Sequence, residues 1–279
     1  MRNLIAAEWT KLIPHKGTWL LVWIYPVLFL LVLTIAIFAE GKNPDAMTAT
    51  GWIDDTTMIW YVPMISLGRY FIAAYFGLVF AGEYGWNTWK LVVPHAARWR
   101  LIAAKYAVAL GLLYVAWIAA AAISLVLAYV EAAVTGTAVP QGVTLAGLAR
   151  AHGQPIVEAI APVLLTAGYA SALAVLTRST LAAFIVSLVL ITFDDLFGKI
   201  VLWLSAFGME WLAVPYRLLP GYHLQNMWMW LHTGAGFKLP LASGTVIAYS
   251  QTVSLAALAI WVVGLVGLTF AVFRRQDIN

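Results

Sequence analysis

The chain has 279 residues, of which 63% are hydrophobic, only 10% are charged and none is cysteine. Soluble domains are about 45–50% apolar and about 25% charged, so this composition excludes an ordinary soluble fold. The lack of cysteine excludes disulfides and thiolate metal sites, and the net charge of +4 fits membrane orientation signals better than nucleic-acid binding. Apolar runs of about 20 residues or more without strict alternation predict transmembrane helices rather than barrel strands.

Residues 1–16 predict a short helix that lies in the membrane interface. Ile5, Trp9 and Leu12 share one helical face, and Pro14 bends the chain before the first apolar run. The alternative is a cytosolic tail whose periodicity arises by chance. No small-residue cleavage site follows the first apolar run, so we expect that run to remain in the protein as a span.

Six apolar runs predict six transmembrane helices in a single domain of residues 1–279. We expect these spans at 17–39, 57–82, 103–130, 155–177, 180–206 and 246–272. Arg178 and Ser179 predict a tight turn between the fourth and fifth spans, and an aromatic-rich segment at 207–245 precedes the last span. The expected fold is therefore an all-α polytopic membrane protein.

Lysine and arginine residues concentrate on one side of these six spans. The positive-inside rule then places both termini and the loop between the second and third spans in the cytoplasm. The residues on that side are Arg2, Lys11, Lys16, Lys90, Arg98, Arg100, Lys105, Arg178, Arg274 and Arg275, against Lys42, Arg150, Arg217 and Lys238 on the other.

The segment 84–100, between the second and third spans, holds the densest polar chemistry of the chain. Glu83 lies where the second span leaves the bilayer, and Gly85 is expected to end that helix in a left-handed conformation. Asn87 and Thr88 are good caps for a new short helix, which Pro94 is expected to end.

Trp86 and Trp89 would give that short helix a rigid contact area of the type that anchors protein interfaces. The alternative is an ordinary interfacial loop with tryptophan in the aromatic belt and arginine on lipid phosphate. Residue types alone do not separate these two interpretations.

The order of residues in this loop resembles that in the membrane permease subunits of type-2 ATP-binding cassette (ABC) transporters. In those proteins a Glu is followed by Gly-Thr, a short apolar helix, a Pro, a basic residue and a Lys. Here the corresponding residues are Glu83, Gly85, Thr88, Leu91, Pro94, Arg98 and Lys105. Many members have the Gly and Thr adjacent, so the intervening "WN" leaves open whether Gly85 or Thr88 caps the helix. The resemblance extends to "AEWTKL", the Arg178-Ser179 turn, "LLPGY" at 218–222 and the closing "FRR".

The resemblance implies an exporter of a hydrophobic or amphipathic substrate in the plasma (inner) membrane of a prokaryote. It implies a homodimer that binds two separate ATPase subunits through a coupling helix, and short outer helices at 207–245 that partly re-enter the membrane. The sequence contains no G-x-x-x-x-G-K-[ST] phosphate loop, so ATP and Mg would bind to the ATPase partner and this chain is expected to be neither an enzyme nor a cofactor binder. The implied coupling residues are Glu83, Gly85, Trp86, Thr88, Trp89, Lys90, Pro94 and Arg98. Glu83 is expected to pair with Arg98 or Arg100.

Charged residues also fall inside the expected spans. Each costs about 2.5–3.5 kcal/mol at the bilayer centre, so Asp194, Asp195 and Lys199 of the fifth span need partners. Asp195 and Lys199 have the spacing of a helical ion pair, and we expect Asp194 to face Arg69 of the second span. These residues either lock spans together, lie on a helix that surfaces early so that the charges reach outer water, or line a substrate path.

Two other classes of function compete with a permease. An integral membrane enzyme would need a nucleophile–base pair or a metal set, but the sequence has no H-E-x-x-H or serine-site motif, and adjacent aspartates diverge on a helix. An ATP-independent channel or carrier predicts matched halves with broken helices, which the sequence does not indicate. His223, His232, Met227 and Met229 do not form a compact ligand set, so no metal site is expected.

Overall fold

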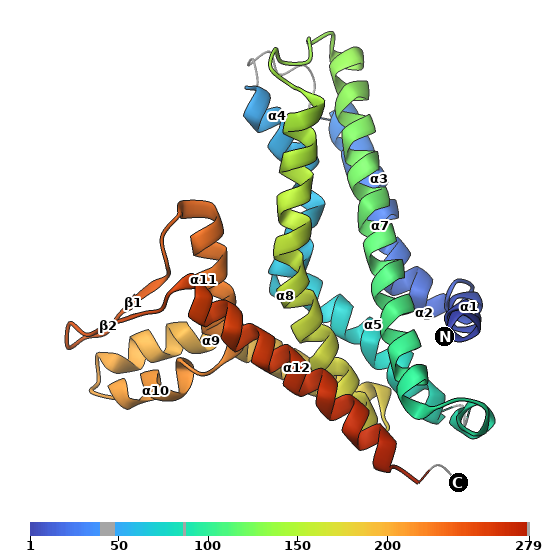
Figure 1. Ribbon diagram of the computed structural model, residues 1–279. Coiled ribbons are helices and arrows are strands. Elements are labelled where there is room, and N and C mark those ends of the chain that lie inside the picture. The colour runs from blue at the N-terminus through green and yellow to red at the C-terminus, as the bar shows by residue number, and fades with distance from the viewer. Residues whose placement is uncertain (40–47, 86–87, 278–279) are drawn as a thin grey trace. The chain divides into compact units, whose positions relative to one another are not determined.

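The computed structural model in Figure 1 describes residues 1–39, 48–85 and 88–277, and these residues are mostly helical. Within these ranges five helices are long and apolar enough to cross a membrane, or six if the bent pair Met58–Met64 and Ser66–Gly85 counts as one span. The five are Lys16–Ala39, α7 (Arg98–Thr135), α8 (Leu145–Thr177), α9 (Thr180–Ser205) and α12 (Gln251–Arg275). The protein is thus a helical membrane protein with several candidate spans.

The chain forms two compact units, each built from two stretches of sequence. The first unit contains residues 1–65 and 93–159, and the second contains residues 66–92 and 160–279. The long helix α8 runs from the first unit into the second.

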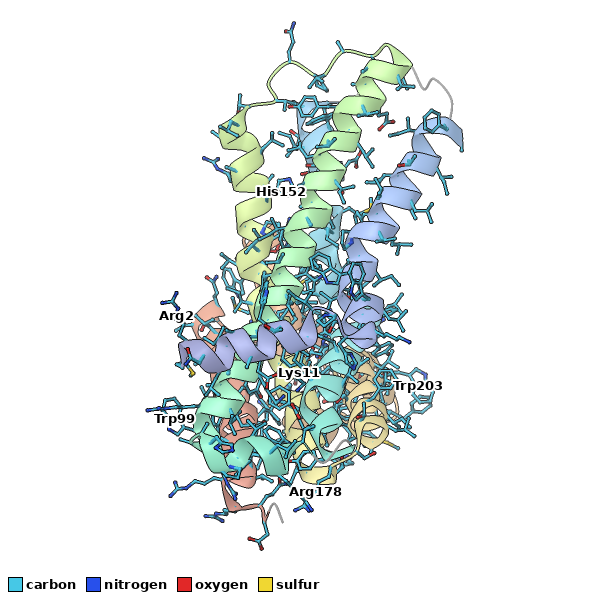
Figure 2. The ribbon with its side chains drawn as sticks, turned by 90° about the vertical axis from the view of Figure 1, so that its right-hand side faces the viewer. Arg2, Lys11, Trp99, His152, Arg178 and Trp203 are labelled. Carbon is cyan, nitrogen blue, oxygen red and sulfur yellow. The ribbon has the colours of Figure 1, made fainter. Side chains whose placement is uncertain are left out.

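In the first unit, the N-terminal helix α1 (Arg2–Leu12) packs crosswise against α7, as Figure 2 shows with Arg2 and Lys11 labelled on α1. Glu8 of α1 accepts a hydrogen bond from the buried Lys105 of α7 at 3.2 Å. After Pro14 the chain continues as α2 (Lys16–Thr18), a π-helical turn η1 (Trp19–Trp23) and α3 (Ile24–Ala39), which packs along α7. A buried lysine without a counter-charge would be costly, so this ion pair fixes where α1 lies on α7.

Also in the first unit, α7 is much longer than the span expected at 103–130. It has 38 residues, or about 57 Å, against a hydrocarbon thickness of about 30 Å, and Gly136 ends it with φ 70°. The short helix α4 (Ala49–Thr56) packs against α7, with the Trp52 and Tyr129 rings 5.0 Å apart.

The second unit contains α5 (Ser66–Gly85), α6 (Trp89–Val92), the second half of α8, α9 and α12. Between α9 and α12 lie η4 (Glu210–Leu212), α10 (Ala213–Tyr216), α11 (Pro220–Thr233) and the antiparallel pair β1 (Lys238–Pro240) and β2 (Val246–Ala248). α5 packs along α9, and α11 packs on both α9 and α12. A small core joins α9 to this outer segment through Val201, Tyr216, Tyr222, Leu239 and Ile247.

Two features differ from the sequence-based expectation. The region expected as one span at 57–82 consists of the 3-10 helix η2 (Met58–Met64), an extended Ile65 and then α5. Pro63 lacks a backbone donor and disfavours a continuous α-helix. The segment 207–245, expected to hold only short helices, also contains the strand β1, which pairs with β2, while the described chain as a whole is mostly helical, as expected.

Candidate functional site

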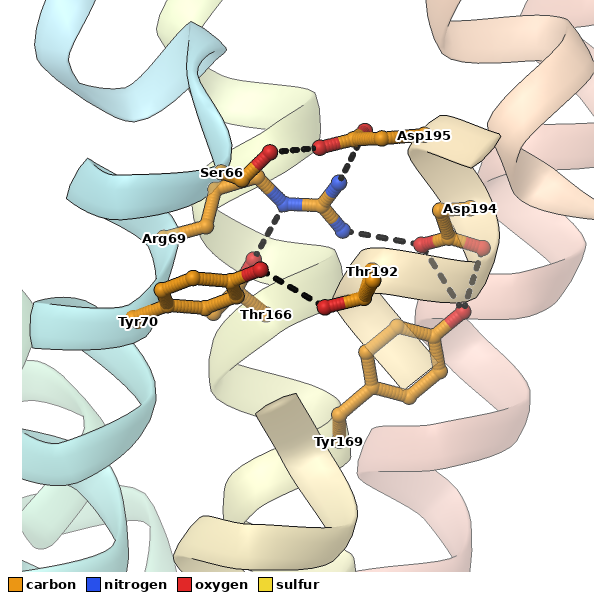
Figure 3. A network of polar contacts seen from close by, with 8 residues as sticks. All are labelled: Ser66, Arg69, Tyr70, Thr166, Tyr169, Thr192, Asp194 and Asp195. Carbon is orange, nitrogen blue, oxygen red and sulfur yellow. Dashed lines mark hydrogen bonds and ion pairs between the residues drawn. The ribbon is translucent and has the colours of Figure 1, made fainter. Parts of the chain in front are cut away.

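The charged residues of α5 and α9 meet in the second unit (Figure 3). The guanidinium Nη2 of Arg69 lies 2.9 Å from Oδ2 of Asp194, and Nη1 lies 3.4 Å from Oδ1 of Asp195. The side chains of Arg69 and Asp194 are 1% and 4% exposed, whereas that of Asp195 is 34% exposed. The ion pair expected between Arg69 and Asp194 is therefore present, and Arg69 serves both carboxylates.

Hydroxyl groups from three helices complete this network. Thr166 of α8 accepts a hydrogen bond from Arg69 Nε at 3.0 Å, and the Tyr169 hydroxyl donates to both oxygens of Asp194 at 3.4 Å. Ser66 donates to Asp195, and the Tyr70 and Thr192 hydroxyls lie 2.6 Å apart. Because buried charges need several hydrogen bonds to offset desolvation, these partners make the cluster tolerable at membrane depth.

Lys199 does not take part in the network. Asp195 turns toward Ser66 and Arg69, and in the part of the chain that the structure describes no ion pair joins it to the exposed Lys199. The expected pair between Asp195 and Lys199 is therefore wrong. Helical spacing makes such a pair available, but Arg69 offers Asp195 a partner that is held rigidly and is already desolvated.

The outer segment lies directly against this network. A Cβ atom added to Gly221, at the start of α11, would overlap the backbone carbonyl of Asp194. A Cβ on Gly198 of α9 would likewise overlap the Tyr216 phenol. Two glycines therefore allow α10 and α11 to approach α9 closely at the turn that carries Asp194 and Asp195.

A second candidate site is the short helix α6, which follows α5. Trp89 is only 2% exposed, and its ring lies 4.4 Å from that of Phe273 on α12 and 5.9 Å from that of Tyr84 on α5. The expectation that Trp89 gives an exposed contact area is wrong, because the ring packs inside its own unit. The exposed residues of α6 are Lys90 and Leu91, the latter 70% exposed, whereas Trp86 and Asn87 lie outside the described residues.

The junction between α5 and α6 is closed by Glu83 and Thr88. Glu83 is 4% exposed and accepts a hydrogen bond from the Thr88 hydroxyl, while the Thr88 backbone N–H donates to the Glu83 carbonyl at 3.1 Å. Gly85 ends α5 without a positive φ, so the expected left-handed termination is wrong. Hydrogen bonds from Thr88 to Glu83 instead connect the start of α6 to the end of α5.

The short α-helix ends just before Pro94, as expected: α6 ends at Val92, within one residue of the expected end at Val93. Pro94 lies in the 3-10 turn η3 (Val93–His95), and α7 begins at Arg98. Pro94 and Arg98 belong to the first unit, whereas Glu83 and Lys90 belong to the second. The pairing of Glu83 with Arg98 or Arg100 stays a prediction.

A buried polar cluster in the outer segment was not expected from the sequence. His223 Nε2 lies 3.0 Å from the Arg217 carbonyl and Nδ1 lies 3.0 Å from Ser254 Oγ. Asn226 donates to Ser254 Oγ and to the carbonyl of Tyr249, the residue after β2, so α11 is joined to α12 and to the end of the hairpin. A carbonyl can only accept, so Nε2 of His223 carries the proton and Nδ1 accepts from Ser254.

The first unit contains a comparable histidine, His152 of α8 (labelled in Figure 2). Trp60 Nε1 donates to His152 Nδ1 at 3.0 Å, and Nε2 lies 3.2 Å from Thr56 Oγ1. In both clusters a histidine is hydrogen-bonded to a Trp, Ser or Thr more than 30 positions away in the sequence, so residue spacing could not predict either cluster.

Within the described ranges no three His, Asp or Glu side chains are grouped to hold a metal ion. No family model, curated protein or solved structure matches the chain.

Proposed function

We propose that the chain is the transmembrane permease subunit of an ATP-driven ABC exporter whose ATPase is a separate subunit. The observation that carries this proposal is the two-sided character of α6. One face is fixed to the bundle by Trp89, and the other presents Lys90 and Leu91. A helix that is rigidly held on one side and exposes a basic and an apolar residue on the other suits docking to a partner protein.

Contacts inside the second unit give α6 a mechanical connection to the membrane helices. Thr88 and Glu83 join α6 to α5, and the Trp89–Phe273 ring contact joins it to α12. α5 in turn is tied to α9 by Arg69 and Asp194. Closure of a docked ATPase would therefore move α6 and pass the displacement to α5, α9 and α12.

The remainder of the proposal follows the family resemblance. The chain would have six spans when η2 and α5 are counted as one, with both termini in the cytoplasm of a prokaryote and α1 in the membrane interface. It would act as a homodimer with two ATPase subunits that bind ATP and Mg. The substrate would be hydrophobic or amphipathic, and Asp195, the exposed member of the charged network, would face its path.

The test is capture of an ATPase by the full-length chain from its native membranes. A tagged chain carrying Lys90→Glu and Leu91→Ala should lose the co-purifying ATP hydrolysis that the unaltered chain retains. Leu218→Ala is the matched control, because Leu218 is 69% exposed on the outer segment, close to the exposure of Leu91. Equal ATP hydrolysis with the α6 variant and with the control would contradict the proposal.

A second candidate, an ATP-independent carrier, gains support from the break at Ile65. Discontinuous helices next to intramembrane charges are typical of secondary transporters, and Ile65 lies four residues before Arg69. The purified chain alone, reconstituted in vesicles with an internal pH dye, would then carry protons or cations down an imposed gradient, and Asp195→Asn would abolish the flux. An ABC permease alone would carry none.

A further inference from the structure

We infer that Gln276 is a positioning residue that joins the ends of α5, α8 and α12, so that these helices move as one body when α6 is displaced. Gln276 follows the last residue of α12 and is 9% exposed. The coupling part of this inference rests on the proposed function, whereas the joining of the three helices does not.

The side-chain amide of Gln276 forms hydrogen bonds with two different helices, one through its oxygen and one through its nitrogen. Its Oε1 accepts a hydrogen bond from the Tyr84 hydroxyl of α5 at 2.5 Å, and its Nε2 donates to the Val175 carbonyl of α8 at 2.6 Å. A carboxylate could make only the first bond and an amine only the second. An amide at this position therefore serves both helices at once.

The Val175 carbonyl is a group that needs such a partner. α8 ends at Thr177, so Val175 lies in the last turn, where helix carbonyls lack intrahelical donors. Val175 is fully buried, so water cannot take the place of a donor. Gln276 thus satisfies from another helix a carbonyl that the end of α8 leaves open.

The same face of α12 receives α6. Phe273 lies three residues before Gln276, which places the two side chains as neighbours at the end of the helix, and Phe273 contacts Trp89. Tyr84, which donates to Gln276, also contacts the Trp89 ring edge-on. Trp89, Phe273, Gln276 and Tyr84 therefore form a closed ring of contacts, and the hydrogen bond from Gln276 to the Val175 carbonyl connects this ring to α8.

The joining of the helices can be tested on the chain alone in lipid nanodiscs. The chain has no cysteine, so cysteines at the exposed positions Leu176 and Ala271 would be the only spin-labelling sites, one at the end of α8 and one near the end of α12. The distance distribution should be narrow in the parent and in the control Asp277→Asn, and broad in Gln276→Leu. Loss of one hydrogen bond corresponds to about a fivefold fall in the ratio of joined to separated helix ends.

Two milder variants, each of which removes one hydrogen bond, distinguish loss of that bond from misfolding of the chain. Gln276→Glu keeps an acceptor for Tyr84 but removes the donor to Val175, so it should broaden the same distribution. Tyr84→Phe removes only the bond to α5 and should leave it narrow. An unchanged distribution in both Gln276→Leu and Gln276→Glu would overturn the inference.

The coupling is tested in the complex with the co-purified ATPase. Labels at Leu67 on α5 and Leu255 on α12, both exposed, should report a nucleotide-dependent shift in distance on trapping with ATP and vanadate. Gln276→Leu and Tyr84→Phe should reduce that shift while ATPase binding is retained, which a residue that only stabilises the fold would not do. A full shift in both variants would overturn the coupling role. If no ATPase binds the parent chain, the proposed function is contradicted, but the joining of the helices measured in nanodiscs still stands.

Discussion

Arg69 and Asp194 form a buried ion pair between α5 and α9, with 2.9 Å separating guanidinium Nη2 from carboxylate Oδ2. Asp195, the next residue, shares the same guanidinium at 3.4 Å but keeps a third of its side chain exposed. Two adjacent carboxylates on one helix thus have different environments, because only one of them is enclosed by α5 and α8.

The three charges predict a definite order of stability losses. Arg69→Gln leaves both carboxylates without their shared cation and should be the most damaging, by about 3–5 kcal/mol, the usual cost of removing one partner of a buried pair. Asp194→Asn leaves Arg69 paired with Asp195 and should cost less, and Asp195→Asn should cost least because its side chain is partly exposed. Unfolding of the purified chain in detergent, followed by tryptophan fluorescence, measures this order.

Combining Arg69→Gln with Asp194→Asn should recover part of the loss caused by Arg69→Gln alone. The recovery is expected because the double variant removes one of the uncompensated carboxylates. If Asp194→Asn proves more damaging than Arg69→Gln, the assignment of Arg69 to both aspartates is incorrect.

Truncation of Trp89 should lower the stability of the chain, whereas truncation of Leu91 should leave it nearly unchanged. Trp89→Ala removes a buried ring that packs on Phe273, and should destabilise the chain by about 3–5 kcal/mol. Leu91→Ala removes an exposed side chain and should leave the melting temperature within about 1 °C, since exposed substitutions usually change stability by less than about 0.5 kcal/mol. Thermal unfolding of the two variants side by side makes the comparison, and equal losses would show that α6 is buried on both faces.

Gly221 should not tolerate a methyl group. Gly221→Ala would push α11 away from the Asp194 carbonyl and should cost more than about 1 kcal/mol, the lower end for overpacking a tight contact. Gly264→Ala in α12 is the control, because its added Cβ meets no atom within 4 Å and alanine favours a helix. Differential scanning calorimetry of both variants should give melting temperatures that move in opposite directions, and a neutral Gly221→Ala would contradict the close approach of α11 to α9.

His223 should make the outer segment weaker in acid. Burial lowers the pKa of His223 below its ordinary value of about 6.5, and its hydrogen bonds to Arg217 and Ser254 suit the neutral ring. The unfolded chain binds a proton more readily than the folded one, so stability is full above about pH 6.5 and falls as the pH drops toward the folded pKa.

Melting temperatures measured between about pH 7.5 and about pH 5 should therefore fall in the parent chain and change less in His223→Gln. His232→Gln is the matched control, because His232 lies exposed in the last turn of the same helix. If the control loses the pH dependence and His223→Gln retains it, His223 is not the titrating group.

The candidate site was predictable in part. Arg69 and Asp194 could be matched from sequence, because a charge at membrane depth demands a partner and few opposite charges are available there. The partner of Asp195 could not be predicted, since helical spacing offered Lys199 and only the approach of α5 made Arg69 the better choice. The role of Gln276 could not be predicted, because an amide near a helix end is common. Its two partners, Tyr84 and Val175, each lie more than 100 positions away in the sequence, and only the fold brings them to it.

The sequence by itself determined that this is a helical membrane protein, because composition and the length of apolar runs leave a chain no other way to satisfy its backbone in lipid. Tertiary structure alone decided that Trp89 faces inward, that the chain breaks at Ile65 and that one arginine serves two aspartates. The physical reason is that hydropathy shows which side chains avoid water. The direction in which a side chain points and the residue with which it pairs depend on which helix packs beside it.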